Sequence, residues 1–249
     1  MVVPRAAWTR FIRPENLNHY AFRMGLTLAS VAVFWSASST GYYALGNKLG
    51  LESGYNEASF SFFIYYLLWT GIALFWFRKA LFERLTQTNT FANLKAMLAL
   101  MAVCVLFVTV FLPSLPPVSM WRAPLDPPEF MFASGWYYLP KSADILFQQV
   151  LLASIIYTAS GLKFRLITVS IGLSIVFGAF HLLLALDGFS PYYVIRFTAA
   201  ASLFGLIAPY IYLRLQNGFL WAYGLHWSFY AVDATITHLL LAVPKWMNF

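Results

Sequence analysis

The chain has 249 residues, of which 61% are hydrophobic, 19% aromatic and only 10% charged. One water-soluble core cannot bury that much apolar surface, so the composition predicts a polytopic membrane protein. The net charge of +7 does not indicate a nucleic-acid-binding protein, because the basic residues flank apolar runs and form no single patch.

The segment 1–21 precedes the first long apolar run. Arg5, Arg10 and Arg13 alternate there with bulky apolar residues. The segment lacks the continuous apolar stretch and the small-residue cleavage site of a signal peptide. We therefore expect an amphipathic segment that lies on an anionic membrane surface, followed by a single transmembrane helical domain over 22–249.

Seven apolar runs follow, each of about the 20 residues that a membrane-spanning helix needs. They predict an all-α transmembrane bundle with helices at Phe22–Tyr43, Phe60–Phe77, Leu94–Leu112, Ala143–Ser160, Leu166–Leu186, Tyr192–Leu213 and Phe219–Leu241.

The charges between the runs predict the orientation of the bundle. Connections with a positive excess alternate with connections that lack one, and a positive excess marks the cytoplasmic side. The positive connections hold Arg5, Arg10, Arg13 and Arg23, then Arg78, Lys79, Arg84 and Lys95, then Lys163 and Arg165, then Arg214; the others hold Lys48 with Glu52 and Glu57, Arg122 and Lys141 with Asp126 and Glu129, and Asp187. We expect the N-terminus inside and the C-terminus outside.

The connection over 113–140 is rich in proline and aromatic residues. Proline argues against a continuous helix, and aromatic residues suit the membrane interface. Interfacial packing and a lid over a site both fit this loop.

Six polar residues fall inside the predicted helices. Polar side chains at membrane depth are costly and are therefore candidates for function. At roughly 1.5 Å per residue, the predicted orientation brings them toward the outer half of the bundle. We expect one shared cavity for Gln148, Gln149, His181, Arg196, His226 and Asp233.

Three sequence blocks carry a family resemblance. They are the Gln148-Gln149 pair, the block Phe177-Gly-Ala-Phe-His181, and the Leu220-Trp221 block that leads to His226. In order and spacing they resemble the signature helices of the CPBP family, the CAAX-prenyl-protease and bacteriocin-processing (Abi-like) intramembrane proteases. The resemblance implies a CPBP-like core over about 143–241.

The chain departs from the family pattern at the reacting positions. The family has a Glu-Glu pair with an arginine four residues after the second glutamate, where this chain has Gln148, Gln149 and Ala153. Tyr230 occupies the position of the family's Asn or Asp, four residues after the last histidine. A glutamine amide cannot act as a general base. We therefore expect no catalytic role at Gln148, Gln149, His181, His226 or Tyr230, and no cofactor or metal.

The resemblance then implies a non-catalytic protein of the bacterial inner membrane. It would hold a partner helix or a prenyl or other lipidic ligand, or serve as an accessory subunit of a larger membrane complex. Its partners would be membrane lipids or other membrane subunits, with no nucleic acid. The expected ligand-binding residues are Gln149, His181, Arg196, His226 and Asp233.

Other interpretations remain open from the residues alone. In an active peptidase with rearranged residues, Asp233 would act as a relocated base, or as a third metal ligand with His181 and His226. The glutamines also suit interhelical hydrogen bonding, and the histidines suit a satisfied core. A small transporter finds little support, because the chain shows no internal repeat.

The charge pattern makes a direct prediction about topology. A tag at the N-terminus should be accessible from the cytoplasmic side of the membrane, and a tag at the C-terminus should be accessible from the opposite side. Protection of both tags on the same side would contradict the predicted count of seven helices and the depth assigned to the polar residues.

Overall fold

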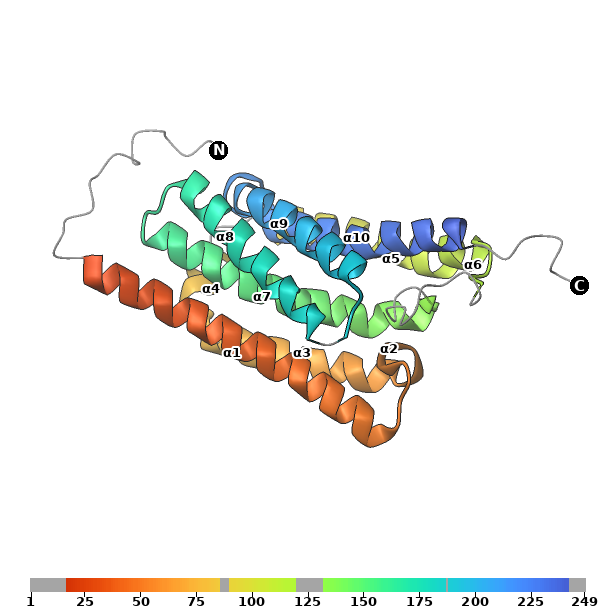
Figure 1. Ribbon diagram of the computed structural model, residues 1–249. Helices are drawn as coiled ribbons and strands as arrows, with labels where there is room; N and C mark the ends of the chain where they lie inside the picture. Colours follow the sequence, from red (N-terminus) through yellow and green to blue (C-terminus); the bar gives the residue numbers. More distant parts are fainter. Residues whose placement is uncertain (1–16, 86–89, 120–131, 187, 242–249) are drawn as a thin grey trace, which may run out of the picture.

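The structure is a computed structural model that describes residues 17–85, 90–119, 132–186 and 188–241. All the regular elements in these residues are helices (Figure 1), which confirms the predicted all-α bundle. The long helices are α1 (Leu17–Leu49), α3 (Ser59–Trp76), α5 (Thr90–Leu106), α7 (Tyr138–Gly161), α8 (Leu166–His181), α9 (Pro191–Arg214) and α10 (Gly218–Leu240). The short ones are α2 (Gly54–Glu57), α4 (Arg78–Leu85), the π-helix η3 (Phe107–Phe111), α6 (Leu112–Ser114) and the 3-10 turns η6 (Gly135–Tyr137) and η7 (Leu182–Ala185).

Six segments among the described residues are long and apolar enough to cross a membrane, as an integral membrane protein requires. They are Asn18–Leu49, Ser59–Trp76, Phe91–Ser114, Gly135–Gly161, Leu166–Ala185 and Pro191–Arg214. The helix α10 is the seventh predicted span and has 23 residues, but it is not among the six. It carries His226 and Asp233, which lower its hydropathy and are both buried against protein.

Several predicted boundaries shift in the structure. The first helix is longer than Phe22–Tyr43, and α7 begins at Tyr138 instead of Ala143. Pro140 is compatible with the first turn of α7, where a backbone N–H has no helical partner to lose. Lys141, which the charge pattern assigned to the connection before Ala143, therefore lies within a helix. Of that loop, 120–131 lies outside the described residues, as does 1–16 of the predicted amphipathic segment.

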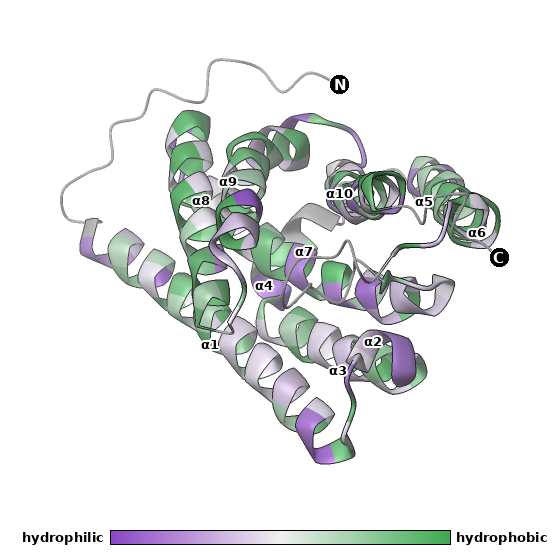
Figure 2. Cartoon of the chain, turned by 45° about the vertical axis from the view of Figure 1, so that its right-hand side comes forward, coloured by the Kyte–Doolittle hydropathy of each residue, from purple (hydrophilic) through white to green (hydrophobic). Residues whose placement is uncertain are grey.

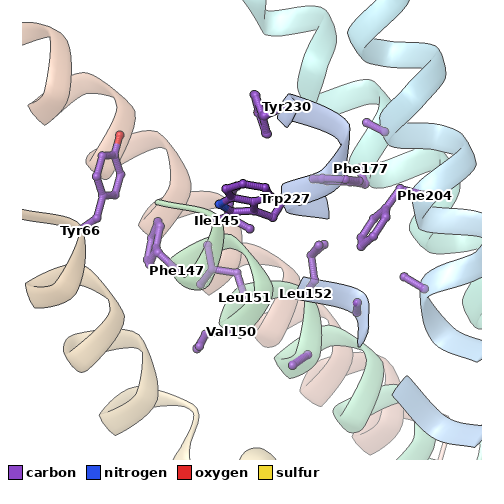
Figure 3. Packing of buried hydrophobic residues seen from close by; sticks show 14 of the residues in the cluster. Tyr66, Ile145, Phe147, Val150, Leu151, Leu152, Phe177, Phe204, Trp227 and Tyr230 are labelled. Carbon is purple, nitrogen blue, oxygen red and sulfur yellow. The ribbon is translucent and has the colours of Figure 1, made fainter. Parts of the chain in front are cut away.

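The helix α7 occupies the centre of the bundle. In the most apolar stretch of its span, 83% of the residues are buried, whereas the share is between 6% and 33% in the corresponding stretches of the other five spans. Figure 2 shows α7 between the α8–α9 pair on one side and α1 and α3 on the other. Side chains from α7 fill the core together with Phe177 of α8, Phe204 of α9 and Trp227 of α10 (Figure 3). A polar residue on α7 therefore faces protein and not lipid.

The helices α8 and α9 pack closely through small residues. A Cβ atom added at Gly205 of α9 would lie 2.9 Å from the backbone oxygen of Leu173 and 2.9 Å from the backbone nitrogen of Ser174. Backbone atoms cannot move aside as a side chain can. Glycine at this position thus allows the two helices to approach at a distance that any other residue would prevent.

This contact predicts a selective effect of alanine. Gly205→Ala should lower the free energy of unfolding by about 1–3 kcal/mol, because the new methyl group overpacks the α8–α9 contact. Gly172→Ala in α8 is the matched control, because its added Cβ has no neighbour within 4 Å. Thermal unfolding in mild detergent measures both variants. Equal melting temperatures for the two would show that the close approach is not required.

Candidate functional site

Gln149 joins three helices at the centre of the bundle. The side chain on α7 is fully buried, and its Nε2 lies 2.8 Å from Nδ1 of His226 on α10. The hydroxyl of Tyr212 on α9 donates to Oε1 of Gln149, and it lies 3.2 Å from the Gln149 backbone oxygen. Because Oε1 accepts from Tyr212, the amide nitrogen faces His226 and donates to Nδ1. The ring proton of a neutral His226 must then sit on Nε2.

A second polar network lies nearer the N-terminal end of α7. The ammonium group of Lys141 is 2.8 Å from Oδ2 of Asp144, and Nε2 of Gln148 donates to Oδ1 over 2.9 Å. The hydroxyl of Tyr55 on α2 also donates to Oδ2, over 3.1 Å. Both carboxylate oxygens of Asp144 thus accept hydrogen bonds from buried donors. Lys141 also lies 4.1 Å from the ring centroid of Tyr230, within cation–π range.

Tyr55 is the member of this network that lies outside the candidate spans. Burial, and then the nearby Asp144 carboxylate, raise the pKa of the Tyr55 hydroxyl well above its usual value. The hydroxyl therefore keeps its proton and remains a hydrogen-bond donor at neutral pH. In this way Tyr55 ties the short helix α2 to α7.

His181 ends α8 and is turned toward its own helix on one side. Its Nδ1 donates to the backbone oxygen of Phe177 over 2.8 Å. Its ring meets the rings of Phe177 and Trp35 edge to face, with centroids 4.8 Å and 6.1 Å away. This hydrogen bond fixes the tautomer and leaves Nε2 as the ring atom available to a ligand.

Two cavities meet at His181. An apolar cavity of about 330 Å³ lies between α8, α9 and α10, and a polar cavity of about 380 Å³ lies between α1, α7, η7 and α10. His181, Phe197 and Tyr230 line both. Figure 3 labels Phe177, Phe204 and Tyr230, which line the apolar cavity. The two cavities therefore adjoin, and their chemical character changes at the shared residues.

The structure brings some of the six candidate residues together and separates others. Gln149 contacts His226, and His226 lines the apolar cavity with His181. Gln148 lines the polar cavity, also with His181.

Arg196 and Asp233 form an ion pair between α9 and α10, and neither is among the residues that line the two cavities. The expectation of one cavity shared by all six residues is therefore not met. An arginine at membrane depth needs a counter-ion, and Asp233 supplies it.

Lys141, Asp144, Tyr55 and Tyr212 are site residues that the sequence analysis did not single out. The i, i+3 and i, i+4 spacings of Lys141, Asp144 and Gln148 place these side chains on one helix face. This spacing carries meaning only in a helix that begins before Ala143, as α7 does. Tyr55 and Tyr212 come from other elements, and no local pattern points to them.

Among the described residues, no three His, Cys, Asp or Glu side chains are grouped as metal ligands. Comparison of the chain with protein-family models, with curated proteins and with solved structures gives no match. The likeness to the CPBP family thus depends on the residues of the three blocks alone.

The buried Lys141–Asp144 pair predicts a non-additive effect. Lys141→Met should lower the free energy of unfolding by about 3–5 kcal/mol, because it leaves a buried carboxylate without a cation. The double variant Lys141→Met, Asp144→Asn should lose less than the sum of the two single variants. Denaturant unfolding in mixed micelles measures the cycle. Additive losses would show that the two groups do not interact.

Proposed function

We propose that this protein is a non-catalytic membrane protein, CPBP-like in its site, that holds an amphiphilic lipid inside the bundle. The apolar chain of the lipid would occupy the cavity between α8, α9 and α10, and its head would occupy the polar cavity. The observation that carries this proposal is the junction of the two cavities at His181, Phe197 and Tyr230. A ligand that spans this junction must itself have a polar and an apolar part.

The size and lining of the cavities support a small ligand. Each falls within the range of roughly 300–1,000 Å³ that is usual for small-molecule sites. The apolar cavity is lined mainly by aliphatic and aromatic side chains, with Ser228 and the two histidines as its most polar members. Hydrocarbon fits such a lining, because it leaves no donor or acceptor unpaired.

The polar groups around the junction support a binding role more than a hydrolytic one. Hydrolysis needs a group that accepts a proton from water. The Gln149 amide cannot do so, and it is engaged with Tyr212 and His226. The carboxylate in the polar cavity is Asp144, whose two oxygens already accept hydrogen bonds from Lys141, Tyr55 and Gln148.

Two other functions are each consistent with a feature of the apolar cavity: a rearranged peptidase and the binding of a partner helix. His181 and His226 line the same cavity, as a rearranged intramembrane peptidase would require. A partner helix of a larger membrane complex could place an apolar side chain in the cavity between α9 and α10. A bacterial cytoplasmic membrane is the proposed location, and the six apolar spans support the coarser statement of an integral membrane protein.

Filling the apolar cavity provides the test. Ala200 lines this cavity, whereas its neighbour Ala199 is exposed and does not. Ala200→Phe should reduce co-purified lipid about tenfold, equivalent to about 1.4 kcal/mol of affinity. Ala199→Phe should leave lipid retention unchanged. Native mass spectrometry of the protein extracted in mild detergent counts the bound lipid.

Two results would overturn the proposal. One is equal lipid retention by the wild type, by Ala200→Phe and by Ala199→Phe. The other is cleavage of prenylated or leader-type peptides that disappears on His181→Ala, which would establish the peptidase alternative.

A further inference from the structure

The helix α1 presents a polar run to the polar cavity. Ser36, Ser39 and Thr40 all line it, although α1 is a candidate membrane span. Thr27 and Ser38 of the same helix bond their hydroxyls to carbonyl oxygens of their own helix, over 3.0 Å and 2.8 Å.

Among the described residues, no such bond is made by the hydroxyls of Ser36, Ser39 and Thr40. These three groups therefore have hydrogen-bonding capacity left at the wall of the cavity, where lipid offers no partner.

The charges that line the polar cavity cancel each other. Its charged residues, among those described, are Lys141 and Asp144, and these form an ion pair of 2.8 Å. Lys141 is further engaged with the Tyr230 ring. A phosphate group entering this cavity would find no cation that is not already paired. Burying an unpaired charge at membrane depth is expensive, so the cavity disfavours an anionic head.

The remaining groups suit a partner that both donates and accepts hydrogen bonds. Serine and threonine hydroxyls do both. The Gln148 amide nitrogen donates to Asp144, and the amide oxygen accepts no hydrogen bond from the described residues. His181 directs Nδ1 to its own helix, which leaves Nε2 for a ligand. A lipid hydroxyl donates one hydrogen bond and accepts up to two, so it can pair with members of both kinds and brings no charge.

We infer that the lipid has an uncharged, hydroxyl-bearing head, of the kind found in a diacylglycerol, and that the α1 hydroxyls select it. This inference rests on the proposed lipid-holding function. The parts of the apolar chains nearest the head enter the cavity beyond the His181 junction, whose volume of about 330 Å³ is too small for two whole chains, and the head lies beside Ser36, Ser39 and Thr40. Specificity comes from the absence of an unpaired cation together with the three hydroxyls.

The experiment offers the protein two lipids that differ in charge. Dioleoylglycerol and dioleoylphosphatidylglycerol carry the same chains, and both carry hydroxyl groups, but only the second is anionic. The wild type in nanodiscs should retain dioleoylglycerol at least tenfold more than dioleoylphosphatidylglycerol, as counted by native mass spectrometry. Free glycerol in excess should not compete, because it lacks the chains.

The variant Ser36→Ala, Ser39→Ala, Thr40→Val removes the three hydroxyls. It should reduce dioleoylglycerol retention about tenfold, the effect of losing one or two net hydrogen bonds. Thr27→Val is the matched control, because its hydroxyl bonds to its own helix and lies outside the cavity. A second measurement does not depend on any variant. A diacylglycerol with a diazirine beside its hydroxyl should label the wild type within 35–43.

The results separate this inference from the proposed function. Preference for dioleoylphosphatidylglycerol, labelling outside 35–43, or unchanged retention in the triple variant would overturn the inference, while Ala200→Phe still reduced binding of either lipid. Competition by free glycerol would show a polyol site and would also overturn it. If neither lipid is retained and Ala200→Phe has no effect, the proposed function itself fails.

Discussion

A polar group inside a membrane-spanning bundle has to be paired with another protein group, since lipid offers neither donors nor acceptors. The helix α7 meets this constraint by lying at the centre, where its buried Lys141, Asp144, Gln148 and Gln149 side chains each have a partner. Asp144 is held by donors from α2 and α7, and Gln149 by groups from α9 and α10. The positions of α2, α9 and α10 around α7 are thus fixed by the same hydrogen bonds that make polar residues tolerable there.

This constraint also accounts for the character of α10. Its buried His226 and Asp233 lower its hydropathy, and each is compensated from a different helix, His226 by Gln149 and Asp233 by Arg196. The opposite face of α10 still exposes apolar side chains, among them Trp221, Val232 and Leu239. The close α8–α9 contact at Gly205 holds the opposite wall of the apolar cavity, so cavity shape depends on packing on one side and on hydrogen bonds on the other.

The sequence predicted the helices well because hydropathy and length depend on local composition. It singled out Gln149 and His226, which are in contact, and His181, which lines the apolar cavity with His226, but Gln149 lines neither cavity. It could not predict that Arg196 and Asp233 pair away from the cavities, since this depends on how α9 and α10 are rotated. Lys141 was assigned to a loop, because a proline-rich stretch gives no sign of where the next helix starts. Tyr212 and Tyr55 are long-range partners, which no local spacing identifies.

A glutamine at position 149 changes what the centre of the bundle can do. A glutamate there would be a buried carboxylate with no nearby cation, and it could exchange a proton with water. The amide instead donates to His226 and accepts from Tyr212 at the same time, which a carboxylate without a proton cannot do. Three helices are thereby joined through uncharged groups, and the bundle avoids the free-energy cost of a buried charge. The bundle can then keep an open space beside His181 and His226 without the destabilising charge of a hydrolytic site, and such a space is suited to holding a ligand unchanged.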